Sequence, residues 1–81
     1  MKAQVYITLK TSVLDPQGST VQRALAQMDY TGVSSVRIGK FMEIELDTSD
    51  EDEARALVDD MCHKLLVNPN IEEYRFTLQA D

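Results

Sequence analysis

The chain has 81 residues, with eight Lys and Arg against fourteen Asp and Glu, a net charge of −6 and a single cysteine. This length fits one domain over residues 1–81, and one cysteine cannot form an internal disulfide. The scattered basic residues and the acidic balance argue against nucleic acid as a partner. The sequence contains no apolar run long enough to span a bilayer, so we expect a cytoplasmic protein without a membrane partner.

A domain of this size has little core to stabilise it. It hides only about 60% of the surface that the unfolded chain exposes, so small domains often depend on a disulfide, a metal or another subunit. The single histidine, His63, has no second His or Cys at zinc-ligand spacing. We therefore expect no metal site, and we expect association with other subunits to supply the missing stability.

The first predicted element is a strand. Residues 3–10 alternate apolar and polar side chains, which is typical of a strand with one buried face. The alternation is lost over residues 11–18, where Asp15-Pro16 and Gly18 favour an ordered loop.

A helix is predicted to follow. Ser19 can cap its first turn, with Gln22 three residues later completing a capping box, and Gly32 is expected to end it. The apolar side chains recur at helical spacing and would form one face. These residues are Val21, Ala24, Leu25 and Met28.

A β-hairpin is predicted next. Val36 and Ile38 should share a buried face with the second strand of the hairpin, whose apolar residues are Met42, Ile44 and Leu46. This register gives a three-residue loop, Gly39-Lys40-Phe41, and places Arg37 opposite Glu43 on the other face.

The last two predicted elements are a helix and a strand. The helix begins at Ser49 or Asp50, and the acidic residues 50–53 suit the positive end of its dipole. Asn68-Pro69-Asn70 ends it. The strand runs from Ile71 to Leu78 with alternating apolar and polar residues.

This order of elements is βαββαβ. It predicts an α+β fold, a two-layer sandwich in which an antiparallel sheet carries both helices on one face, as in ferredoxin-like folds.

The sequence offers no convincing catalytic group. Residues 50–53 are explained as a solvated first helical turn, and Cys62 as a small hydrophobic residue. His63 is expected at the surface or at an interface. Base-stacking aromatics in a basic, glycine-containing motif and a C-x-x-C metal motif are both missing. We predict no catalytic site and no bound cofactor.

The uncovered sheet face remains a candidate for contact with another subunit, and the alternative is a solvated surface. The residues expected there are Tyr6, Thr8, Lys10, Arg37, Glu43, Glu45, Arg75 and Thr77.

Two segments carry a resemblance to a known family. Residues 10–18 read K-T-S-V-L-D-P-Q-G, and residues 36–43 read V-R-I-G-K-F-M-E. They resemble the K-x-x-V-L-D-P-Q-G and V-R-x-G-K-x-x-E motifs of the PurS family, in the same order and within a chain of similar length. The resemblance covers essentially the whole chain.

PurS proteins are small non-catalytic subunits of phosphoribosylformylglycinamidine synthase, a purine-biosynthesis ligase. The resemblance implies a bridge between a glutaminase subunit of the PurQ type and a large synthetase subunit of the PurL type, which assists ammonia transfer. ATP, Mg and glutamine would be used by those partners. The resemblance also implies a homodimer or a tetramer.

The resemblance implies subunit-interface roles for residues in both motifs. These residues are Leu14, Asp15, Pro16, Gln17, Gly18, Arg37, Gly39, Lys40 and Glu43.

Two other classes of protein share features with the predicted fold. A regulatory module of the ACT type has the same βαββαβ order and would bind a small molecule at a subunit interface. A small hydrolase of the acylphosphatase type needs an arginine in the loop after the first strand, and residues 11–18 contain none.

Overall fold

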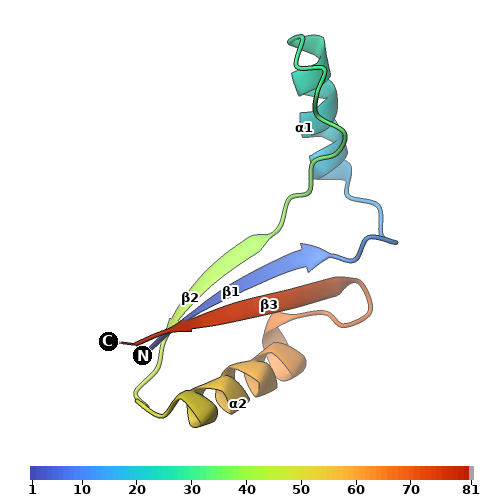
Figure 1. The fold of residues 1–81 in the computed structure, drawn as a ribbon. Coiled ribbons are helices and arrows are strands. Elements are labelled where there is room, and N and C mark those ends of the chain that lie inside the picture. Colours follow the sequence, from blue (N-terminus) through green and yellow to red (C-terminus); the bar gives the residue numbers. More distant parts are fainter. Residues whose placement is uncertain (81) are drawn as a thin grey trace.

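The structure, a computed structural model, describes residues 1–80, so the expected domain lies within it except for Asp81. Three strands and two α-helices follow one another along the chain, and a short π-helical turn, η1, extends the second helix (Figure 1). The elements are β1 (Lys2–Leu9), α1 (Pro16–Gln27), β2 (Lys40–Glu45), α2 (Glu51–Met61), η1 (Cys62–Leu66) and β3 (Glu72–Gln79).

The sheet is antiparallel throughout and has the order β2-β1-β3. In the central strand, Val5 lies opposite Met42 of β2 and opposite Phe76 of β3. Ala3, Val5 and Ile7 of β1 are buried, as the alternating sequence predicts, and Leu9 at the end of the strand is half-buried. β2 and β3 are the two edges of this sheet.

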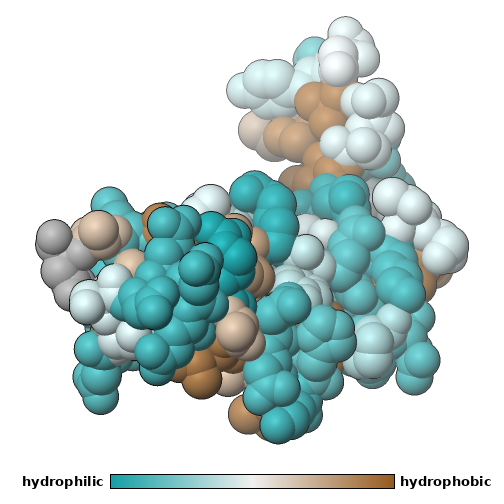
Figure 2. All heavy atoms as spheres, turned by 60° about the horizontal axis from the view of Figure 1, so that its bottom comes forward, coloured by the Kyte–Doolittle hydropathy of each residue, from teal (hydrophilic) through white to brown (hydrophobic). Residues whose placement is uncertain are grey.

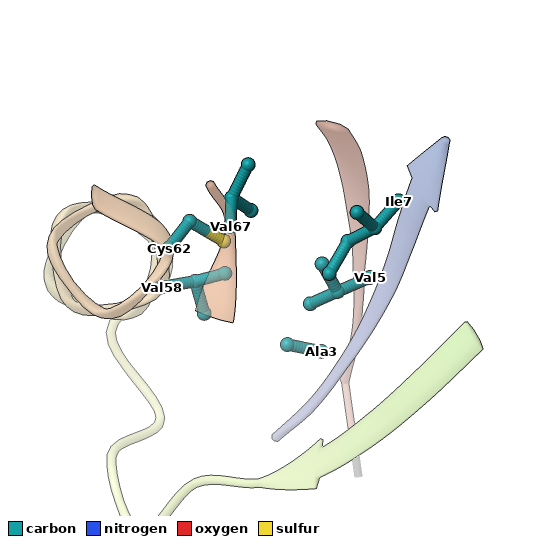
Figure 3. Packing of buried hydrophobic residues seen from close by; sticks show 6 residues of the cluster. All are labelled: Ala3, Val5, Ile7, Val58, Cys62 and Val67. Carbon is teal, nitrogen blue, oxygen red and sulfur yellow. The ribbon is translucent and has the colours of Figure 1, made fainter. Parts of the chain in front are cut away.

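The core lies between the sheet and α2. Ala3, Val5 and Ile7 of β1 are almost fully buried and face Val58 and Cys62, as Figure 3 shows. The helix begins at its cap, Asp50, which accepts hydrogen bonds from the backbone N–H groups of residues 52 and 53. Glu51, Asp52 and Glu53 occupy its first turn, where the helix dipole favours negative charge.

The other helix, α1, stands away from the sheet (Figure 1). The resulting molecule measures 48 × 28 × 14 Å and has a radius of gyration of 16.1 Å. A compact chain of this length would have a radius of about 12 Å. We call residues 16–38, which comprise α1 and the segment that returns beside it, the arm, and the rest of the described chain the body.

The predicted α+β class and antiparallel sheet are confirmed. Two details differ from expectation. The described residues have the order βαβαβ instead of βαββαβ, and one helix covers the sheet instead of two. The sequence correctly indicates an apolar face on α1, but periodicity does not say which surface covers that face.

The predicted hairpin does not form. Residues 33–38 are not a strand but run beside α1, where Gln22 Nε2 donates to the backbone oxygen of Ser34 at 2.8 Å. Consequently Glu43 lies opposite Gln4 of β1, and Arg37 lies beside Thr8 and Leu9. Val36 and Ile38 gave too short a pattern to distinguish a strand from an extended segment.

The ends of α1 also differ from the prediction. The helix begins at Pro16, with Asp15 as its cap, one turn before Ser19. It ends at Gln27 because Asp29 adopts φ of 70° and the N–H of Tyr30 donates to the oxygen of Leu25. This arrangement is a Schellman motif, so the left-handed residue is an aspartate and not the expected Gly32.

Candidate interface: the arm and its base

The arm carries an apolar face that the described chain covers only in part. The face predicted for α1 is largely open: Val21 is 38% exposed and Met28 is 65% exposed. The returning segment adds Tyr30, Val33 and Ile38, all exposed. Figure 2 shows this apolar surface along the arm, flanked by polar side chains. An amphipathic helix normally buries such a face, so the arm is a candidate surface for another protein.

The base of the arm is where its two chain segments meet the body. Asp15 lies there and accepts two backbone hydrogen bonds. Its Oδ1 accepts from the N–H of Gly18 at 2.9 Å, and its Oδ2 accepts from the N–H of Ile38 at 2.8 Å. These bonds, led by the one from Gly18, lower the pKa of Asp15 because they stabilise the carboxylate. One side chain thus joins the start of α1 to the end of the returning segment.

Arg37 fastens the same region to the sheet. Its guanidinium Nη2 donates to the backbone oxygen of Leu9 and lies 3.2 Å from Thr8 Oγ1. It also forms an ion pair with Glu73 of β3 at 3.2 Å. These side chains are exposed, so the ion pair adds little by itself, but it links the arm to β1 and β3 together.

Two glycines allow the backbone segments at the base to approach closely. A Cβ added to Gly18 would lie 2.1 Å from the oxygen of Val36, and a Cβ added to Gly39 would lie 2.2 Å from the oxygen of Ile7. No side chain fits at either position without a backbone shift. Both glycines are therefore needed for the geometry of the base.

The open face of the sheet carries an aromatic cluster. The rings of Tyr6 and Phe41 lie 5.0 Å apart, and the guanidinium of Arg75 lies 4.2 Å from the Tyr6 ring centre. They border a shallow hollow of about 330 Å³ that also includes Lys40. Aromatic and arginine side chains are enriched in the energetic centres of protein interfaces, so this face is a second candidate surface.

The remaining predicted interface residues occupy two places. Leu14 is 77% exposed, and Pro16 and Gln17 are exposed beside it at the base. Lys40 is the first residue of β2, directly after the base of the arm, and it pairs with Glu72 at 3.4 Å. Glu43 is separate from the base and pairs with Lys2 at 2.9 Å.

A polar cluster formed by residues of α2, η1 and β3 offers no complete catalytic arrangement. The hydroxyl of Tyr74 donates to Asp59, and this bond raises the pKa of Tyr74 to about 12. His63 Nδ1 lies 3.4 Å from the same hydroxyl. Cys62 is buried, and burial raises the pKa of its thiol, which disfavours the reactive thiolate. Within residues 1–80, no group of three or more His, Cys, Asp and Glu side chains could hold a metal ion.

No helix in residues 1–80 has both the length and the apolar character needed to cross a membrane.

Comparison with known proteins places these features in a family. The sequence model of PurS, described as phosphoribosylformylglycinamidine (FGAM) synthase, matches residues 2–80. The chain belongs to the PurS family. Subunit PurS of phosphoribosylformylglycinamidine synthase from Bacillus subtilis is 54% identical over 78 residues, which are 96% of this chain and 92% of that protein.

Solved structures agree with this assignment. The crystal structure of Methanocaldococcus jannaschii PurS is 38% identical and has a TM-score of 0.88 over 99% of this chain and 96% of that one. A chain in the structure of PurLQS from Thermotoga maritima is 32% identical, with a TM-score of 0.86 over 94% of this chain and 93% of that one. The predicted family is thus confirmed.

Sequence reasoning did not find how the two motifs are connected. It selected Asp15 and Arg37 as candidates but assigned them to contacts with other subunits. It placed Thr8 on the uncovered sheet face, without a contact to Arg37, and it did not select Glu73. The aspartate before Pro16 was the available signal, because Asp at a helix cap followed by Pro at the first helical position is a strong helix start.

Proposed function

We propose that this chain is the non-catalytic PurS subunit of a phosphoribosylformylglycinamidine synthase in purine biosynthesis. In this proposal it bridges a glutaminase subunit of the PurQ type and an ATP-dependent synthetase subunit of the PurL type, and it assists ammonia transfer between them. The complex acts in the cytoplasm. ATP, Mg and glutamine are used by the partners, and this chain binds no cofactor.

One observation carries the proposal: the apolar face of the arm is largely exposed. In so small a chain, leaving this face exposed to water costs stability that the chain can hardly spare. Burying apolar surface contributes roughly 25 cal/mol per Å², and a chain of this size has little stability in reserve. A subunit whose role is to dock needs such a surface. It needs no nucleophile of its own.

Self-association is part of the same proposal. A second copy of the chain offers a surface of matching size and apolar character, and closed dimers are the commonest oligomers. We propose that the arm takes part in a homodimer, or in a tetramer built from two dimers. The aromatic cluster of Tyr6, Phe41 and Arg75 on the open sheet face then remains available to the larger subunits.

The interface proposed for the complex includes residues of both motifs. We assign contact roles to the exposed side chains of Leu14, Pro16, Gln17 and Lys40 at the base, and to Glu43 on the open face. Asp15, Gly18, Arg37 and Gly39 contribute by shaping the base.

Reconstitution tests the proposal. The chain is mixed with the glutaminase and synthetase subunits of its own organism, and formylglycinamidine ribonucleotide formation is measured with glutamine and, separately, with ammonia. We expect glutamine-dependent turnover to require the chain and ammonia-dependent turnover to proceed without it. Equal glutamine-dependent turnover with and without the chain would rule out the bridging role.

Sedimentation equilibrium of the isolated chain tests self-association. We expect a dimer or tetramer at micromolar concentration. A monomer at all concentrations that also fails to co-purify with the two larger subunits would contradict the proposed assembly role.

A further inference from the structure

The two motifs that characterise the sequence are one structural unit. Asp15 of the first motif and Ile38 of the second lie 23 positions apart in the chain, yet they meet at the base of the arm. The carboxylate of Asp15 in the first motif accepts from the N–H of Ile38 in the second, and Gly18 in the first lies against the backbone of Val36 in the second.

The carboxylate geometry explains why an aspartate suits this position. Each of its two oxygens accepts from a different backbone N–H, one in the first turn of α1 and one in the returning segment. An ordinary helix cap needs only the first of these bonds. The second bond fixes the separation of the two segments through which the arm is attached.

The two segments that attach the arm to the body offer few other contacts that could fix its direction. Between Leu9 and the start of α1 the chain forms a turn in which the N–H of Val13 donates to the oxygen of Lys10. On the return side, Gly39 leads directly into β2. The outer part of α1 stands away from the sheet (Figure 1). Within one chain, the direction of the arm thus depends on the base.

We propose that Asp15 is a positioning residue that sets the direction of the arm relative to the body. It joins the two attachment segments, and Arg37 anchors the returning one to Leu9 and Glu73. The inference rests on the proposed function for its purpose: a bridging subunit must present its apolar arm in a fixed direction if both larger subunits are to be held in register.

A distance measurement tests this role. Spin labels are placed on Thr31→Cys at the arm tip and on Ala56→Cys of α2, two exposed positions. Cys62 is buried, so the parent chain serves as the labelling blank. Labelled chain is diluted into excess unlabelled chain, so that only distances within one chain are recorded. We expect a single narrow distance distribution for the doubly labelled parent.

Asp15→Ser is the decisive variant. A serine hydroxyl can still cap α1, but it is too short to reach Ile38 at the same time. We expect the distance distribution to broaden at least two-fold while the far-UV circular dichroism stays the same. Asp15→Asn is the second variant, because it matches the size of aspartate but offers only one oxygen acceptor. We expect it to broaden the distribution as well.

Asp50→Ser is the matched control. Asp50 caps α2 in the same way, but its accepted bonds stay within its own helix. We expect this variant to leave the arm distance unchanged. An unchanged distribution in both Asp15 variants, or equal broadening in Asp50→Ser, overturns the positioning role.

Turnover of the reconstituted complex separates this inference from the proposed function. We expect Asp15→Ser to lower glutamine-dependent turnover about ten-fold and to leave ammonia-dependent turnover unchanged, with Asp50→Ser like the parent. A broadened arm distance with unchanged glutamine-dependent turnover upholds the positioning role and counts against the bridging function. An unchanged arm distance overturns the positioning role whatever the turnover.

Discussion

The body and the arm each contain an amphipathic helix, but only the helix of the body buries its apolar face. α2 buries Ala54, Val58 and the adjoining Cys62 completely against the sheet, whereas α1 buries only Gly18, at its base. The body is therefore stabilised by its own core, and the arm is held mainly by hydrogen bonds at its base and along its returning segment. The comparison teaches that an apolar face specifies the need for a covering surface, but not whether that surface belongs to the same chain.

The largest effect is expected from a cavity in the body. Ile7→Ala removes a side chain that is 1% exposed in the centre of the core. We expect it to lower the free energy of unfolding by about 2–5 kcal/mol, enough to unfold much of a marginal domain. Urea denaturation followed by circular dichroism measures this change. A loss below about 1 kcal/mol would show that the body does not depend on its own core.

The next effect concerns the arm alone. Val21→Asp places a charge on the open apolar face. We expect it to weaken self-association by about ten-fold or more, as for the loss of an interface anchor, and to leave the body folded. Sedimentation equilibrium gives the dissociation constant. Arg23→Asp is the control, because a residue two positions after Val21 lies on nearly the opposite side of the helix. Equal weakening of self-association by both variants would contradict a specific apolar contact.

A smaller effect should distinguish the two helix starts. Asp50→Ala removes the cap of α2, and we expect it to lower the free energy of unfolding by about 1 kcal/mol. The exposed Asp47, which lies just before the helix, serves as a control: Asp47→Ala removes the same charge but no cap. Equal losses in the two variants would point to net charge and not to capping.

The smallest expected effect is a pH dependence within the body. The pKa of Tyr74 is raised from its usual 10.0 to about 12, chiefly by the hydrogen bond to Asp59. A raised pKa means that this contribution to stability is complete below pH 10 and is lost as the pH rises towards 12. We expect the difference in urea midpoint between the parent and Tyr74→Phe to shrink across this range. A difference that stays constant from pH 9 to 12 would argue against the bond to Asp59.

Prediction from sequence succeeded where neighbouring residues decide the structure. The alternation over residues 3–10 and 71–78 located β1 and β3 to within about two residues. Asp50, one of the two residues expected at the start of α2, is its cap. In these elements the buried face packs against a surface of the same body.

Prediction failed where long-range contacts decide. Val36 and Ile38 alternate like a strand, but their segment lies along α1, where Gln22 bonds to the backbone of residues 33 and 34. Ser19 resembled a helix cap, yet Asp15 occupies that position because Pro16 is favourable at the first helical residue. The link from Asp15 to Ile38 spans 23 residues, a separation over which one sequence gives no local signal.

The pairing of β1 with β3 has a consequence for the synthesis and folding of the chain itself. Lys2 lies opposite Gln79, so the central strand gains one of its two neighbours only after the residues up to Gln79 have been made. Pairings of such high sequence separation form slowly, since most of the chain must be ordered to close them. Nascent chains should therefore expose both the unfinished sheet and the apolar arm, and encounters with partner subunits become productive only after synthesis has passed β3.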